Sequence, residues 1–273
     1  MEEVRKFLRT IDRLIITGGS SGIGESFIEL VLKIEPNLKI CNLSRSESER
    51  FLDWPQLTHI PCDLSRPEAI DEAFSELSKW LESSGSGRIL LINNSGYGLY
   101  GHFGEIDRDK QLNMMDLNMR AVVDLTHRLL PALKSNGGHV LNAASIAGHQ
   151  PTPYLGTYGA TKAFVLQWSL AMGVEHAASG VDFTVLCPGP TESQFFQRAG
   201  FDQPPVPGMG HSAEFVVVQA LKGLARRRVV VTTGWMNRLT TALSRRLPLS
   251  WQAKISGAVM RRMRLEQKQE SAS

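Results

Sequence analysis

The chain has 273 residues, of which 42% are hydrophobic and 21% are charged, and its formal net charge is +3. This hydrophobic content excludes a mainly disordered chain, the three cysteines are too few for a disulfide-stapled scaffold, and the length suffices for one large domain or two modest ones. The total charge hides an uneven distribution, because residues 1–220 carry a net −7 and residues 221–273 a net +10.

Two further features concern the cellular compartment. No stretch approaches the roughly 18 apolar residues that a membrane span needs, and the first residues mix charges of both signs, unlike a secretory signal. Cys41, Cys62 and Cys187 lie in apolar runs without the spacing of metal ligands. We therefore expect small buried thiols, no metal site and a cytoplasmic protein.

Short apolar runs alternate with longer helical patterns along the whole chain. Strands are expected at residues 13–17, 38–44, 57–62, 88–93, 139–144, 181–187 and 229–233, and helices at 23–34, 67–81, 105–130, 156–178 and 212–225. The strands are apolar throughout, as in parallel sheets covered on both faces. The pattern predicts an α/β fold with a doubly wound parallel sheet over residues 10–234 and a helical extension over residues 235–273. The long helix is expected to end before Pro131.

A glycine cluster follows the first expected strand and opens the first helix. Glycines there allow a tight turn and close approach of the backbone to a diphosphate, and the helix N-terminus offers free N–H groups. Because of this position, a dinucleotide site is favoured over an ordinary Gly/Ser loop, and no Gly-Lys-Ser/Thr follows, as a Walker loop would require. The candidate cofactor-binding residues in this turn are Gly18, Ser20, Ser21, Gly22, Ile23 and Gly24.

The end of the second strand indicates which nucleotide is bound. No acidic residue stands there to hold a free ribose hydroxyl, whereas Arg45 can form a charge-assisted fork to a 2′-phosphate and Ser44 adds a donor. We therefore predict NADP(H) rather than NAD(H), the alternative being a solvated loop arginine. Asp63, at the end of the third strand, is expected either to accept from the adenine amino group or to cap the next turn.

A tyrosine and a lysine lie four residues apart at the start of the helix after the fifth strand. Tyr158 and Lys162 therefore share one helix face, where a lysine ammonium should lower the pKa of the phenol and make it a general acid or base. The pair alone is weak evidence. Its context is stronger: Ser145 follows the fifth strand, Asn94-Ser95-Gly96 ends the fourth, and Asn118 lies in the long helix between them.

With these motifs the chain resembles the short-chain dehydrogenase/reductase family over about residues 10–235. The resemblance rests on the Thr-Gly-x-x-x-Gly-x-Gly turn from Thr17, the Asn-Asn-x-Gly segment from Asn93, Asn118, Ser145, Tyr158-x-x-x-Lys162 and Pro188-Gly189. It implies a Rossmann-like fold with a seven-stranded sheet, a nicotinamide cofactor and a catalytic tetrad of Asn118, Ser145, Tyr158 and Lys162. Ser95 departs from the alanine usual in the family, and we expect little effect from it.

The resemblance also implies roles. NADPH would deliver hydride to a ketone or aldehyde, or the reverse, with Tyr158 exchanging the proton, Ser145 bound to the same oxygen, Lys162 on the nicotinamide ribose and Asn118 holding a relay water. Further cofactor contacts are expected from Asn94, Ser95, Gly96, Pro188, Gly189 and Thr191. The expected partners are a small-molecule carbonyl or alcohol substrate and further copies in a homodimer or homotetramer, with no nucleic acid.

Residues 191–210 are expected to form a lid whose apolar residues, Phe195, Phe196, Phe201 and Met209, favour an apolar carbonyl substrate, the alternative being that these side chains pack on the domain. Residues 147–154 are expected to line the opposite wall, with His149 a loop histidine that takes no part in proton relay.

The extension shows the pattern of two basic amphipathic helices, separated at Pro248. Their apolar stripes are Met236, Leu239, Leu243 and Leu247, then Trp251, Ile255, Val259 and Met263. We expect these stripes to cover the protein's own body or a dimer mate, and keep peripheral membrane contact through residues 235–264 as the alternative. A non-catalytic regulatory protein that binds a nicotinamide nucleotide also remains as an alternative function.

Overall fold

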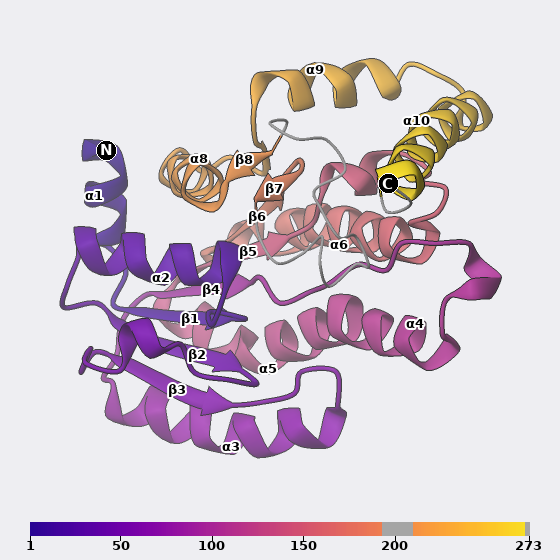
Figure 1. Ribbon diagram of the computed structural model, residues 1–273. Coiled ribbons are helices and arrows are strands. Elements are labelled where there is room, and N and C mark those ends of the chain that lie inside the picture. The colour runs from indigo at the N-terminus through magenta and orange to yellow at the C-terminus, as the bar shows by residue number, and fades with distance from the viewer. Residues whose placement is uncertain (193–209, 271–273) are drawn as a thin grey trace.

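Seven parallel strands form the central sheet of the computed structural model, which describes residues 1–192 and 210–270, with side chains described up to residue 261 (Figure 1). The order is β3-β2-β1-β4-β5-β6-β9, and every neighbouring pair is parallel. The strands are β1 (Arg13–Thr17), β2 (Lys39–Ser44), β3 (Leu57–Pro61), β4 (Ile89–Asn93), β5 (Gly138–Ala143), β6 (Val181–Cys187) and β9 (Val230–Thr232). The predicted doubly wound, Rossmann-like sheet is confirmed.

Helices cover both faces of the sheet (Figure 1). One face carries α1 (Glu2–Leu8), α2 (Gly22–Ile34) and α8 (Ala213–Ala225), and the other α3 (Pro67–Ser83), α5 (Ala121–Asn136) and α6 (Gly156–Glu175). A hydrophobic core lies on each face of the sheet, and successive residues of β1 point alternately into one core and the other. Leu14 and Ile16 pack toward α2, whereas Ile15 packs toward α3 and α5. This explains why the strands are apolar throughout rather than alternating.

The sequence analysis missed α1. Val4 and Leu8 are at most 1% exposed and pack with α2 and α8, so this short helix belongs to the core although it precedes the expected domain start at residue 10. The spacing of Val4, Phe7 and Leu8 is the apolar signal that could have identified it.

The expected helix over residues 105–130 is wrong in its limits. It consists of α4 (Arg108–Met115), a π-helical turn over Asp116–Arg120, and α5, which continues through Pro131 to Asn136. Proline cannot donate the helical hydrogen bond. Leu129 and Leu133 are both fully buried on either side of it, and packing on the sheet outweighs the lost bond.

The chain reverses its direction of winding at β1, which pairs with β2 on one side and β4 on the other. In sheets of this kind, ligands bind beyond the carboxyl ends of the strands at that point. The loops after β1, β4 and β5 meet at this edge.

Two short strands and two helices complete the described chain: β7 (Thr191–Glu192), β8 (His211–Ser212), α9 (Trp235–Ser244) and α10 (Leu249–Glu270). The expected lid residues Phe195, Phe196, Phe201 and Met209 lie outside the described residues, as does the side chain of Met263. None of the helices in residues 1–192 and 210–270 has the length and apolar character that a membrane span requires.

Candidate active site

The turn after β1 is shaped by its glycines. Gly18 has a φ of 68°, in the left-handed region that favours glycine. A Cβ atom at Gly24 would collide with the carbonyl oxygen of Gly18, so the helix can begin this close to the strand only without a side chain there. Ser21 precedes the first residue of α2 and makes no side-chain cap, which leaves the N–H groups of the first turn to a ligand. The remaining predicted residues of the turn are Ser20, Gly22 and Ile23.

Thr17, named above only as the first residue of the glycine turn, joins this turn to the end of β4. Its Oγ1 accepts from the backbone N–H groups of Asn94 and Ser95, both at 2.9 Å. The Asn94 amide in return donates to the carbonyl oxygens of Thr17 at 3.1 Å and Gly18 at 3.2 Å. The two loops therefore form one unit at the edge of the sheet.

The end of β2 presents a cation to solvent. Ser44 is buried, and its hydroxyl donates to the carbonyl oxygen of Ser46 at 2.8 Å. Arg45, the next residue, is exposed. Asp63 accepts through Oδ1 from the backbone N–H of Ser65 at 3.1 Å and from its hydroxyl at 2.7 Å, so this carboxylate caps the turn after β3.

Asn118 lies within the π-helical turn and is almost completely buried. Its Nδ2 donates to the Tyr97 carbonyl and to Thr161 Oγ1, both at 3.0 Å, and its Oδ1 accepts from the Tyr97 N–H at 3.2 Å. A π-turn interrupts the regular helical hydrogen-bond ladder and is frequent at functional sites. The side chain thus locks the loop after β4 to α6.

Gly96 brings Asn118 and Lys162 together. A Cβ atom at this glycine would lie 2.9 Å from Asn118 Oδ1 and 3.2 Å from Lys162 Nζ. The ammonium of Lys162 donates to the Ala143 carbonyl oxygen at the end of β5, at 2.8 Å. The lysine is therefore anchored between the ends of two strands.

Ser145 and Tyr158 complete the group, because their side chains are joined by a hydrogen bond. The Ser145 hydroxyl also accepts from the Ala147 N–H at 3.1 Å, which fixes it at the start of the loop after β5. Lys162 Nζ lies 5.8 Å from the centre of the Tyr158 ring. The structure thus brings all four predicted tetrad residues together.

Comparison with known proteins agrees with this geometry. A family model described as short chain dehydrogenase matches residues 12–203. The chain belongs to the short-chain dehydrogenase family. The uncharacterized oxidoreductase YbbO of Escherichia coli K12 is 31% identical over 208 residues, which are 75% of this chain and 76% of that protein.

Solved structures of the family share the fold. A short-chain dehydrogenase from Sphingobium yanoikuyae in complex with NADPH is 27% identical, with a TM-score of 0.72 over 81% of this chain and 87% of that one. A short chain dehydrogenase/reductase from Burkholderia phymatum in complex with NAD has a TM-score of 0.75 over 86% and 92% of the two chains at 20% identity, which is a likeness of fold alone.

In this member of the short-chain dehydrogenase family, burial dominates the titration of the tyrosine and the lysine. Burial raises the pKa of Tyr158 to about 12, although the hydrogen bond with Ser145 acts to lower it. Burial also lowers the pKa of Lys162 to about 8. The pKa of Tyr158 is therefore raised on balance, and not lowered as the sequence predicted, because the loss of hydration around both groups outweighs the effect of a Lys162 ammonium that faces the Ala143 carbonyl.

An apolar cluster surrounds Tyr158. Met114 of α4 and Leu155 are buried against it, and Met260 of α10 packs on the same cluster. The Tyr100 hydroxyl donates to the Met260 carbonyl oxygen at 2.9 Å, which ties the last helix to the loop after β4. Sequence reasoning missed Met260, since nothing local shows that a helix so far along the chain returns to the tyrosine.

The predicted residues after β6 and in the loop after β5 meet α9. Gly189 lies directly against Asn237, and Thr191 Oγ1 donates to the Gly189 carbonyl at 3.0 Å. Pro188 accepts from the Ile146 N–H through its carbonyl oxygen, at 3.0 Å. His149 Nδ1 lies 3.1 Å from the Arg245 guanidinium, and burial together with that cation lowers its pKa.

The three cysteines are free and buried, as expected. Among the described side chains, no three His, Cys, Asp or Glu residues lie together in a group that could hold a metal ion.

Proposed function

We propose that this protein is an NADP(H)-dependent oxidoreductase that reduces a ketone or aldehyde, or oxidises the corresponding alcohol. The observation that carries the proposal is the Ser145–Tyr158 hydrogen bond inside an apolar cluster, with Lys162 and Asn118 fixed behind it. A polar pair in so apolar a setting suits a small carbonyl group on an otherwise apolar substrate.

The residues at the edge of the sheet fit a dinucleotide. Three features match its phosphates: the uncapped N-terminus of α2, the glycine turn that approaches it, and the exposed Arg45 beyond β2. The residues proposed to hold the cofactor are Gly18, Ser20, Ser21, Gly22, Ile23, Gly24, Ser44, Arg45, Asp63, Asn94, Ser95, Gly96, Tyr158, Lys162, Pro188, Gly189 and Thr191. When bound, the nicotinamide supplies the hydride.

The side chains supply the proton and hold the substrate. With a pKa of about 12, Tyr158 keeps its proton at neutral pH and can donate it to a carbonyl oxygen as negative charge develops there. Ser145 donates a hydrogen bond to the same oxygen and thereby orients the carbonyl. Lys162, with its pKa of about 8, is mostly charged at neutral pH and favours the phenolate that Tyr158 becomes.

Removal of the Tyr158 hydroxyl tests the reaction. Tyr158→Phe should reduce kcat for NADPH oxidation with a panel of ketones and aldehydes by about 10²- to 10⁴-fold, with NADPH affinity measured by fluorescence titration nearly unchanged. Tyr97→Phe is the matched control, since it removes a phenolic hydroxyl bonded to the Lys110 carbonyl rather than to Ser145. Full turnover by Tyr158→Phe would refute the role given to this tyrosine. No turnover by the wild type on any carbonyl would leave the nucleotide-binding regulatory protein as the better description.

Reversal of charge at Arg45 tests the choice of cofactor. The solved relatives above include a complex with NADPH and a complex with NAD, so the preference rests on this arginine. Arg45→Asp should weaken NADPH binding by about 10- to 100-fold and leave NADH binding unchanged or tighter. Arg5→Asp on α1 makes the same change of net charge elsewhere and should have no effect. Equal affinity of wild type and Arg45→Asp for NADPH would refute the assignment.

A further inference from the structure

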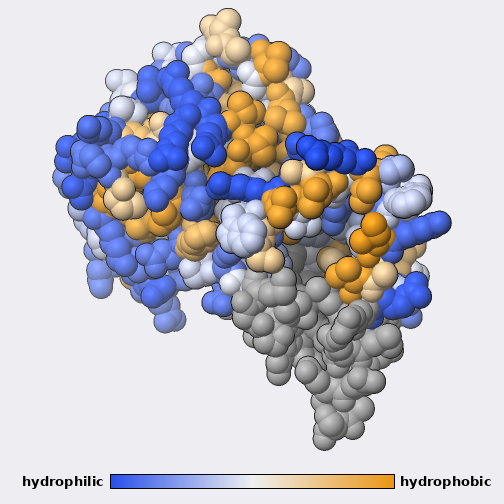
Figure 2. Space-filling model, turned by 90° about the horizontal axis from the view of Figure 1, so that it is seen from above, coloured by the Kyte–Doolittle hydropathy of each residue, from blue (hydrophilic) through white to orange (hydrophobic). Residues whose placement is uncertain are grey.

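The exposed hydrophobic side chains of this protein are concentrated in α9, α10 and the turn between them. Nine of the eighteen large hydrophobic residues found exposed in the described chain lie within residues 235–259. Figure 2 looks onto this side of the molecule and shows hydrophobic residues gathered there among hydrophilic ones. The nine residues, defined here as the apolar stripe, are Trp235, Met236, Leu239, Leu243, Leu247, Leu249, Trp251, Ile255 and Val259.

Besides Met260, small and polar residues attach the two helices to the body. Ser244, Gln252 and Ser256 are buried, and the Ser256 hydroxyl donates to the Pro151 carbonyl at 2.7 Å. Gly257 lies against Pro153. For the described residues of the apolar stripe, the expectation that they cover the protein's own body is therefore wrong, while cover by a dimer mate stays a prediction. An exposed hydrophobic patch rimmed by polar residues marks an interaction site.

Cations flank the apolar stripe. Residues 235–265 contain seven Lys and Arg and no Asp or Glu. The seven-residue spacings of Arg238 with Arg245, and of Lys254 with Arg261, place each pair along one side of its helix. No salt bridge found among the described residues neutralises any of these four side chains.

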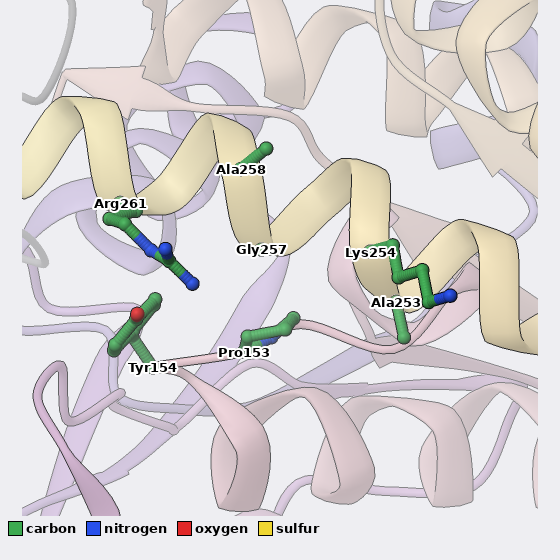
Figure 3. A pocket seen from close by; sticks show the side chains of 7 residues that line it. All are labelled: Pro153, Tyr154, Ala253, Lys254, Gly257, Ala258 and Arg261. Carbon is green, nitrogen blue, oxygen red and sulfur yellow. The ribbon is translucent and has the colours of Figure 1, made fainter.

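Two of these cations border a hollow of about 480 Å³ between α10 and the loop at Pro153 and Tyr154. Figure 3 shows Lys254 and Arg261 on α10 above this loop, with the Arg261 side chain directed toward Tyr154. An anionic headgroup placed here would meet both cations while the neighbouring stripe contacts acyl chains. The charge of the hollow therefore suits an anionic lipid headgroup, and its volume is large enough for one such group.

A second copy of the chain fits this surface poorly. Pairing through the same face in both copies would set one uncompensated basic helix pair against another. An anionic bilayer matches both the cations and the apolar stripe. Its headgroups neutralise the cations, and its interior takes up the apolar side chains, with Trp235 and Trp251 at the boundary between the two. We propose that α9 and α10 dock this protein on the surface of a membrane rich in anionic lipids.

Co-sedimentation of the full chain with lipid vesicles tests the docking. The wild type should bind vesicles of phosphatidylcholine with phosphatidylserine, bind pure phosphatidylcholine far more weakly, and be released by high salt. The double variant Leu243→Glu/Ile255→Glu should lose at least about tenfold in affinity, and Arg246→Gln about fivefold, the effect expected of one cation near an anionic surface.

Leu52→Glu/Val174→Glu is the matched control, because both residues are exposed hydrophobic side chains outside the extension. It should bind the anionic vesicles as the wild type does, and circular dichroism should show every variant folded. Failure of the wild type to bind anionic vesicles, or equal binding by the stripe variant, overturns the proposal. So does sedimentation velocity that shows a wild-type dimer and a monomeric stripe variant, since the stripe is then an interface between copies.

Discussion

The central sheet and the C-terminal extension are both rich in apolar side chains, but the sheet buries them and the extension exposes them. Leu14, Ile15 and Ile16 of β1 are fully buried, whereas Leu239 and Leu243 of α9 are each 52% exposed. The difference teaches that hydrophobic periodicity predicts the type of an element but not the partner that its apolar side meets. In the sheet the partner is the protein's own core; in the extension it lies outside the described chain.

Polar residues differ between the two regions in the same way. Thr17, Asn94 and Asn118 stand at strand ends or in a helical irregularity, where their hydrogen bonds build the site. Ser256 in α10 fixes the helix on the loop at Pro151, and Gln252 donates to the Leu247 carbonyl in the turn that precedes its own helix. Buried polar side chains at the edge of the sheet thus shape the candidate site, whereas those in the extension hold its helices in place.

Truncation of one leucine in each region should give the largest contrast. Leu129→Ala removes a fully buried side chain beneath the sheet and should lower the free energy of unfolding by about 2–5 kcal/mol. Leu243→Ala, its control in the extension, should cost less than about 0.5 kcal/mol in the absence of lipid. Urea denaturation measures both. A similar loss in the two variants would show that the apolar stripe is buried in solution, which breaks the comparison.

Loss of the Thr17 hydroxyl should have the next largest effect. Thr17→Val leaves the N–H groups of Asn94 and Ser95 without their acceptor and should destabilise the fold by about 1–3 kcal/mol, with weaker NADPH binding as well. Thr184→Val removes a buried hydroxyl that donates to the Arg228 carbonyl, remote from the glycine turn, and should leave NADPH binding intact. Equal NADPH affinity in both variants would contradict the structural role given to Thr17.

Lys162 should make a smaller, pH-dependent contribution. Its folded pKa of about 8 is below its ordinary value of 10.5, so between these values the unfolded chain binds the proton that the folded chain has lost. Stability from this group therefore rises with pH, by about 1 kcal/mol between pH 8 and 9. The buried cysteines, with pKa values raised to about 12, act in the opposite direction.

The difference between wild type and Lys162→Met isolates the lysine, because both proteins share the cysteines. Thermal or urea denaturation at pH 7, 8 and 9 should show the wild type gaining stability relative to the variant. A constant difference across this range would mean that the ammonium keeps its ordinary pKa in the folded protein.

Much of the sheet and of the site was predictable from the sequence. All seven strands follow from apolar runs bounded by Gly, Pro, Asn or charged residues, and the motif order brought Asn118, Ser145, Tyr158 and Lys162 into one group. The strands follow from local apolar patterns, whereas the tetrad was implied by the resemblance of its motifs to the short-chain dehydrogenase/reductase family.

The remainder depends on tertiary packing. The passage of α5 through Pro131 is decided by the burial of Leu129 and Leu133, and the raised pKa of Tyr158 by the loss of hydration around it. The approach of Met260 to Tyr158 needs the path of the whole chain. None of these has a local sequence signal, because each arises from residues distant in the chain.

The π-helical turn at Asp116–Arg120 sets the rotational phase between α4 and α5. One inserted residue advances the helix surface by about 100°, so a side chain positioned from α4 by regular α-helical geometry would face another direction in α5. Met114 of α4 thereby packs with Tyr158, while Leu125 and Leu129 of α5 pack against the sheet. Deletion of a single residue from this turn would restore regular helical geometry. The helix could then pack correctly either on the Tyr158 cluster or on the sheet, but not on both. The irregularity is thus what lets one nearly continuous helix serve both the core and the active site.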